Sequence, residues 1–126
     1  MRLKLEFRGQ KYDIYAIVRD DGSCPFDSFL ERLKKENAGS YKSMVSTLRR
    51  HSDSGPITSV KKSRQIEGHG KLWEFKTRQG DRLLYFYMPG GRTVLVHGFH
   101  KGKPSEAEVE FEKAARLRDQ YLALQG

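Results

Sequence analysis

The residues best suited to chemistry in this chain are basic, and most of its excess charge lies in one segment. Of the 126 residues, 24 are lysine or arginine and 16 are aspartate or glutamate, which gives a formal net charge of +8. Residues 60–103 carry most of this excess, with ten basic side chains against three acidic ones. Such a segregated charge is typical of a surface that contacts a polyanion or an acidic partner. A basic face that is merely solvated is the competing interpretation.

Four histidines are the other candidate chemical groups. An imidazole can exchange a proton near neutral pH because its ordinary pKa is about 6.5. His100 ends an apolar strand pattern and is either a general acid or base or a surface histidine. His97 follows the pattern of a buried strand, whereas His51 and His69 carry no such signal. No carboxylate stands at metal-ligand spacing from these histidines, so we expect no metal, no cofactor and no metal-dependent nuclease.

The length and the single cysteine limit the class of protein. A chain of 126 residues predicts one domain, over residues 1–126. Cys24 stands alone, which excludes an intramolecular disulfide and a multi-cysteine zinc site, and we expect it to be structural. No apolar run approaches the roughly 20 residues that a membrane-spanning helix needs. The sequence therefore predicts a cytoplasmic protein without membrane contact.

The first half of the chain predicts two strands and then two amphipathic helices. Strands are expected over residues 3–7 and 12–18, where apolar and polar residues alternate. The first helix begins at Pro25, and Ser40 is expected to cap the second. Their apolar stripes predict an antiparallel hairpin that packs on a sheet. A DNA-binding helix-turn-helix is the alternative, but that motif has a shorter turn.

The second half predicts three strands and a final helix. After a basic loop over residues 55–70, strands are expected over residues 72–78, 82–88 and 93–100, joined by short glycine-containing turns. A capping box from Ser105 to Glu108 predicts the start of the last helix. The order ββαα–βββ–α indicates an α+β domain whose last three strands form a meander.

The first strand of this meander groups its charges on one face. Glu74, Lys76 and Arg78 alternate with apolar residues, so we expect them on a sheet face open to solvent. Lys76 and Arg78 stand across a tight turn from Arg82, and residues that flank such a turn lie close together. These three basic side chains could therefore meet one phosphate. Trp73 lies on the opposite face and is expected in the core rather than stacked on a base.

Five segments, in this order and spacing, match the pattern of a known family. They are SCPFDSFL at 23–30, IEG at 66–68, LWEFK at 72–76, RLLYF at 82–86 and VLVHGFHK at 94–101. The chain resembles the RelE/ParE superfamily of toxins from bacterial toxin–antitoxin pairs, and within it the HigB-like, phage-derived branch. The resemblance covers roughly residues 12–122.

The resemblance implies a fold, an activity and partners. The implied fold is a small antiparallel sheet, formed by the meander and an N-terminal strand or hairpin, with a two-helix hairpin and a C-terminal helix. The implied activity is metal-independent endoribonuclease cleavage of mRNA in the ribosomal A site, by attack of the ribose 2′-oxygen on the adjacent phosphate. The implied partners are mRNA, the 70S ribosome and a HigA-like helix-turn-helix antitoxin. The alternatives are a ParE-type toxin that inhibits DNA gyrase without catalysis, or a basic domain that only binds nucleic acid or a protein.

The resemblance also implies roles for individual residues. Arg82 is expected to bind the scissile phosphate bidentately, and its replacement by alanine is expected to abolish toxicity while leaving the fold intact. Catalytic contacts are also implied for Lys76, Arg78, His100 and Lys101. Phosphate contacts that position the protein on ribosomal RNA are implied for Lys61, Lys62, Arg64 and Lys103.

Overall fold

One six-stranded sheet, with helices on both faces, makes up the computed structural model, which describes residues 1–57 and 62–125. In chain order the elements are β1 (Arg2–Phe7), β2 (Asp13–Val18), α1 (Pro25–Glu36), α2 (Ala38–Ser54), β3 (Ser63–Ile66), β4 (Leu72–Lys76), β5 (Asp81–Met88), β6 (Arg92–His100) and α3 (Pro104–Gln125). None of the helices in the described ranges combines the length and hydropathy of a membrane span. The α+β class expected from the sequence is confirmed.

The sheet contains one parallel pair of strands. Its strand order is β1-β2-β6-β5-β4-β3. After β2 the chain crosses through α1 and α2 to the far edge of the sheet, and β3 to β6 return as an antiparallel meander. The last strand of the meander, β6, lies parallel to β2, with Ile14 opposite Thr93. The expectation of a wholly antiparallel sheet is therefore corrected by this one pair.

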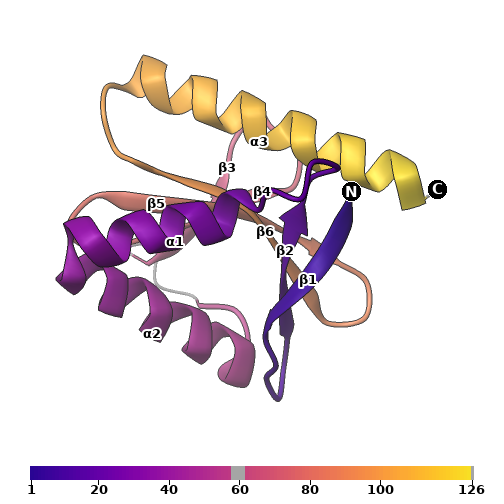
Figure 1. Ribbon diagram of the computed structural model, residues 1–126, viewed down its shortest axis with the longest axis horizontal. Helices are drawn as coiled ribbons and strands as arrows, with labels where there is room; N and C mark the ends of the chain where they lie inside the picture. Colours follow the sequence, from indigo (N-terminus) through magenta and orange to yellow (C-terminus); the bar gives the residue numbers. More distant parts are fainter. Residues whose placement is uncertain (58–61, 126) are drawn as a thin grey trace.

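The two faces of the sheet bury separate cores (Figure 1). The α1–α2 hairpin packs its apolar stripes on one face, as the sequence predicted. This core contains Phe26, Phe29, Leu33, Met44, Leu48, Phe75, Leu83, Tyr85 and Leu95, among others. Helix α3 covers the other face through Phe111, Ala114, Leu117 and Tyr121. Because strand side chains alternate, each residue of β4 and β5 belongs to either the α1–α2 face or the α3 face.

The strand β3 lies within the segment that the sequence predicted as a basic loop. It pairs antiparallel with β4, with Ser63 opposite Phe75 and Ile66 opposite Leu72. Four residues with a single large apolar side chain carry no alternation signal. The strand forms because its backbone completes the edge of β4 and because Ser63 and Ile66 are buried.

Two helices begin at residues other than those expected. The side chain of Asn37, not that of Ser40, caps α2 by accepting a hydrogen bond from the Ser40 backbone N–H at 3.0 Å. Helix α3 already begins at Pro104, where the Lys103 carbonyl accepts the first backbone hydrogen bonds. Ser105 therefore lies in the first turn of the helix rather than at its cap.

A bulge interrupts the pairing of β5 with β6. Leu83 lies opposite Gly98 and Tyr85 lies opposite Leu95, so β6 contains one extra residue between these pairs. Immediately after the bulge, Gly98 lies against the ring of Phe29 on α1. A Cβ atom at position 98 would come within 2.5 Å of that ring, so this close packing of α1 on β6 requires glycine.

The bulge changes which side chains of β6 face α3 in the part of the strand that follows it. Val96 is part of the core under α3, and His97 also contacts α3. From there Phe99 packs against α3, while His100 pairs with Asp81 and points to the α1–α2 face. Strict alternation from Val96 would have placed His100 on the α3 face instead.

His51 is a fully buried titratable group in the core between α2 and the sheet. Its ring lies within 6 Å of the ring centroids of Tyr12, Phe75, Tyr85 and Tyr87. The Nε2 atom lies 2.9 Å from the Thr93 hydroxyl, and Nδ1 has no hydrogen-bond partner among the described residues. Burial lowers the pKa of His51 to about 4.

We expect His51 to make the folded state less stable as the pH falls from about 6.5 to about 4. In this window the unfolded chain binds a proton that the native core does not accept. The resulting decrease in the free energy of unfolding reaches on the order of 3 kcal/mol. Urea unfolding of the wild type and of His51→Gln at several pH values measures the effect. The stability advantage of the wild type should shrink toward low pH, and a constant difference would contradict the expectation.

Candidate functional site

A cleft of about 320 Å³ opens between the α3 face of the sheet and the start of α3. Three basic side chains line it: Arg64 of β3, Arg82 of β5 and Lys101, which follows β6. Lys76 of β4 lies directly opposite Arg82 in the strand pairing, on the same face. We call this the basic cleft. Of the expected catalytic residues, Arg82 and Lys101 line this cleft and Lys76 lies next to Arg82, and the cleft also includes Arg64.

The floor of the basic cleft is a buried carboxylate. The side chain of Glu74 is 1% exposed, and Arg82 donates a hydrogen bond from Nη1 to its Oε1. On the other side, Arg64 Nη2 lies 3.1 Å from Glu74 Oε2. Glu74 therefore holds two guanidinium groups side by side at the same wall of the cleft.

This geometry corrects two expectations drawn from the sequence. Glu74 was expected on an open face, but α3 and the two arginines cover it. Replacing Arg82 was expected to leave the fold intact, but its side chain is only 15% exposed and its Nε is buried without a hydrogen-bond partner among the described residues. Removing Arg82 alone would leave a buried carboxylate short of a partner, which is strongly destabilising. The Arg82→Ala variant should therefore not leave the fold intact.

Positive charge dominates the basic cleft despite Glu74. Partial burial lowers the pKa of Lys76, and the positive charges of Arg82, Arg64 and Lys101 lower it further, while Glu74 opposes the shift. Four cations thus act on one another around the buried carboxylate of Glu74, while a second carboxylate, that of Glu108, lines the cleft at the start of α3. An anion bound among them would relieve this repulsion, and charged donors make the strongest hydrogen bonds to phosphate oxygens.

The remaining basic candidates lie elsewhere. Arg78 is exposed in the turn between β4 and β5. Lys62 lies beside β3, with its Nζ 3.5 Å from the Ser43 hydroxyl of α2. Lys103 is exposed immediately before α3. Lys61 lies outside the described residues. Of the three described residues expected to contact ribosomal RNA, Arg64 is therefore the one that belongs to the basic cleft.

His100 opens on a different cleft, on the other side of the end of β6. This second cleft has a volume of about 690 Å³ and is lined by Arg32, Asn37, Asp81 and His100, among others. We call it the histidine cleft. Phe99 lines both clefts, so the end of β6 separates them. The bulge in β6 decides which of these two consecutive residues, His100 and Lys101, faces which cleft, so that Lys101 rather than His100 joins Arg82.

The histidines at positions 69 and 97 are both held by acidic residues of α3. His97 Nε2 lies 2.9 Å from Glu110, and burial lowers the pKa of His97 against the opposing effect of that carboxylate. His69 Nε2 contacts Glu108, which also lines the basic cleft. The sequence indicated only that acidic residues favour the start of a helix, a signal that does not reveal such distant contacts.

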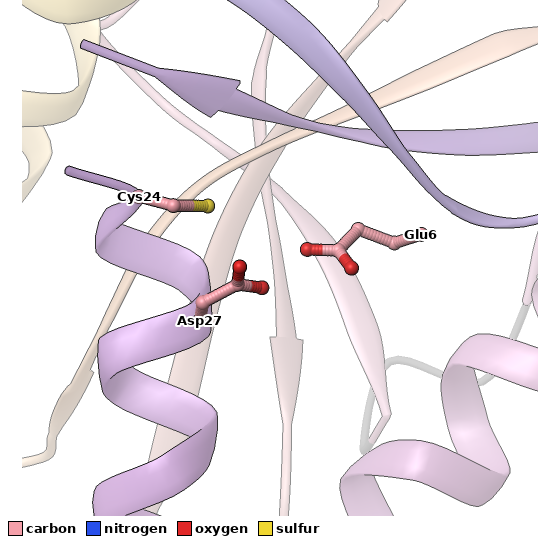
Figure 2. A group of neighbouring side chains, drawn as sticks. All are labelled: Glu6, Cys24 and Asp27. Atoms are coloured by element: carbon pink, nitrogen blue, oxygen red, sulfur yellow. The ribbon is translucent and has the colours of Figure 1, made fainter. Parts of the chain in front are cut away.

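Three potential metal ligands lie together near the start of α1 (Figure 2). They are Glu6, Cys24 and Asp27, whose ligand atoms all lie within 4.8 Å of one another. The Lys4 ammonium already neutralises this group, with its Nζ 2.5 Å from Asp27 and 3.7 Å from Glu6. Burial and the facing carboxyl group of Asp27 raise the pKa of Glu6 to about 8, and burial raises the pKa of the Cys24 thiol. The group is best described as a carboxyl pair that shares a proton beside an unreactive thiol.

Comparison with known proteins identifies the family. The model of the phage-derived Gp49-like family (DUF891) matches residues 29–119, which include both clefts' strands. The chain belongs to this family. Its members are RelE/ParE-type toxins, so the resemblance to that superfamily is confirmed. Membership in a toxin–antitoxin family implies an antitoxin partner.

A solved structure shows the same fold. A YoeB/ParE toxin from Agrobacterium tumefaciens is similar with a TM-score of 0.54 and 12% sequence identity. The match covers 71% of this chain and 98% of that one. At this identity the similarity concerns the fold alone. A search of curated proteins found no match to the chain.

We expect the carboxyl pair to give stability a pH dependence opposite to that of His51. Native Glu6 keeps its proton up to about pH 8, whereas the unfolded chain loses it from about pH 4.5, so stability falls as the pH rises through this window. In urea unfolding, the free energy of unfolding of Glu6→Gln should depend less on pH than that of the wild type. The stability of the variant relative to the wild type should be greatest above pH 8. The exposed Glu31→Gln is the control and should follow the wild type. A Glu6→Gln profile parallel to the wild type would show that Glu6 titrates normally.

Proposed function

We propose that this chain is the toxin of a toxin–antitoxin pair and cleaves mRNA on the ribosome. The reaction is attack of a ribose 2′-oxygen on the adjacent phosphate, without a metal ion. The single observation that supports this most strongly is the basic cleft, where Arg64, Lys76, Arg82 and Lys101 surround one buried carboxylate. The partners that follow are mRNA, the 70S ribosome and a HigA-like antitoxin.

The role of the basic cleft is to stabilise negative charge on the scissile phosphate. A hydrogen bond to Glu74 already orients the guanidinium group of Arg82, so this group loses little freedom when it binds phosphate oxygens, and the charge of Glu74 attracts the more exposed Arg64 to its other oxygen. Lys101 and Lys76 add positive charge without a demanding geometry. Because charge on these oxygens increases in the transition state, the four cations stabilise that state more than the bound substrate.

The role of His100 is proton transfer. The 2′-oxygen must lose a proton and the leaving 5′-oxygen must gain one, and an exposed imidazole that reaches the scissile phosphate can serve either step. The end of β6 carries His100 toward one cleft and Lys101 toward the other. Both reacting oxygens lie at the scissile phosphorus, so an RNA strand that uses Lys101 and His100 together must place that phosphate at the end of β6, where the two clefts adjoin.

Induced expression in bacteria, followed by mapping of mRNA 5′ ends, tests this function. Cuts in phase with codons support a ribosome-dependent endoribonuclease. Growth arrest with intact transcripts and an SOS response would instead favour the gyrase-inhibiting alternative. Growth without arrest would favour a domain that only binds nucleic acid or a protein.

We expect the double variant Arg82→Gln, Glu74→Gln to fold and to cleave at least about 10²-fold more slowly than the wild type. Replacing both partners avoids an uncompensated buried charge, so the loss would report on the phosphate contact rather than on unfolding. Arg92→Gln, at the opposite end of β6, is the matched control and should cleave normally. Thermal unfolding and single-turnover cleavage measure the two effects. A folded double variant that cleaves at the wild-type rate would remove Arg82 from the site.

Ribosome binding should weaken with salt, and the basic-cleft residues should contribute to the slope. Each lost phosphate contact reduces the slope of log K against log salt by about 0.7–0.9. We expect this change for Arg64→Gln and Lys101→Gln, and for Lys62→Gln if it also contacts ribosomal RNA. The exposed Lys35→Gln on α1 is the control. Binding to 70S ribosomes at several salt concentrations measures the slopes. If the variants had the same slope as the wild type, the cleft would contact no phosphate.

A further inference from the structure

We infer that Asp81 is a positioning residue that orients His100 for proton transfer, an inference that rests on the proposed function. The Asp81 side chain is 8% exposed and lies directly across the β5–β6 pairing from His100. Its Oδ1 lies 3.0 Å from His100 Nδ1. Neither residue's spacing in the sequence signals this contact, because it depends on the bulge in β6.

Asp81 is itself held in place from three directions. Its Oδ2 accepts a hydrogen bond from the Ser40 hydroxyl at the start of α2. Its backbone N–H donates to the Thr77 hydroxyl at 3.1 Å, and its carbonyl accepts from the Thr77 N–H at 2.9 Å. The Ser40 and Thr77 hydroxyls lie 2.7 Å apart. The carboxylate therefore has one orientation, and it offers one oxygen to His100.

The imidazole of His100 is held by its surroundings on the side of Nδ1 and is open to solvent elsewhere. Gly80 lies under the ring, where a Cβ atom would come within 3.4 Å of Cε1. The backbone N–H of Lys101 donates to the Gly80 carbonyl at 2.7 Å, which joins the end of β6 to the β4–β5 turn. The His100 side chain is nevertheless 64% exposed. With Nδ1 directed at Asp81, Nε2 is the nitrogen available to a substrate at the end of β6.

This contact has two chemical consequences. A carboxylate that accepts from Nδ1–H selects the neutral tautomer in which Nε2 carries the lone pair. The same carboxylate stabilises the imidazolium that forms when Nε2 takes a proton. Both effects act on the reaction through His100, and neither requires Asp81 to touch the substrate.

A double-mutant cycle measures the coupling. We expect Asp81→Asn to lower kcat by about 10-fold to 10²-fold with little change in KM, since general acid–base catalysis as a whole contributes about 10²–10⁴. The double variant Asp81→Asn, His100→Gln should be no slower than His100→Gln alone, because Asp81 then has nothing to orient. Thr93→Val removes a buried hydroxyl elsewhere in β6 and serves as the control for a general loss of stability. If the fold-reductions in kcat caused by Asp81→Asn and His100→Gln simply multiplied in the double variant, the inference would be overturned.

Nitrogen NMR of the histidine side chains provides a readout that needs no activity. In the wild type the neutral His100 ring should carry its proton on Nδ1, and in Asp81→Asn the proton should move in part to Nε2. A wild-type ring protonated on Nε2 would overturn the inference even if Asp81→Asn failed to fold. If the wild type cleaves no RNA, the proposed function fails, and the tautomer then decides separately whether Asp81 orients His100.

Discussion

The buried carboxylate of Glu74 is the constraint on which the candidate site depends. An isolated ionised carboxylate inside a protein costs several kcal/mol, so Glu74 must be paired to remain charged. Its partners come from both neighbouring strands, Arg64 from β3 and Arg82 from β5. The ion pairs therefore also hold the edge strand β3 to the rest of the meander. With Arg82 fixed by its hydrogen bond and Arg64 attracted to the same carboxylate, the two guanidinium groups form a site for a phosphate, and the proposed cleavage uses it as one.

The second constraint is the bulge in β6, which decides whether His100 or Lys101 shares a cleft with Arg82. Without the extra residue, His100 and Arg82 would project on the same face of the sheet, and Lys101 would project on the other. With it, Lys101 joins Arg82 in the basic cleft, and His100 reaches Asp81 and the α2 side. Gly98 lies next to the bulge and allows α1 to pack closely on β6. The packing of the first helix and the placement of the candidate catalytic groups thus depend on the same few residues of one central strand.

Most of the fold could be predicted from the sequence, because its long elements have clear patterns. Alternating residues identified β2 and β4, helical spacing identified α1 and α2, and glycine turns identified the meander. The strand β3 was missed because its four residues owe their structure to β4 rather than to their own pattern. The burial of Glu74 was missed because the helix that covers it begins 30 residues later in the chain. The pairing of Lys76 with Arg82 followed from the turn, whereas the contact of His100 with Asp81 depended on a bulge that no residue pattern indicated.

The chemistry of the cut tests the proposed function most directly. Ribosomes would be programmed with a defined mRNA, the position of the cut would be determined, and the nucleotide on its 5′ side would then be replaced by its 2′-deoxy form. If the 2′-oxygen is the nucleophile, the unmodified mRNA should give a fragment ending in a 2′,3′-cyclic phosphate, and the deoxy-substituted mRNA should remain intact at that position. Cleavage of the deoxy-substituted mRNA at the same bond, or no cleavage of either mRNA, would contradict the proposal.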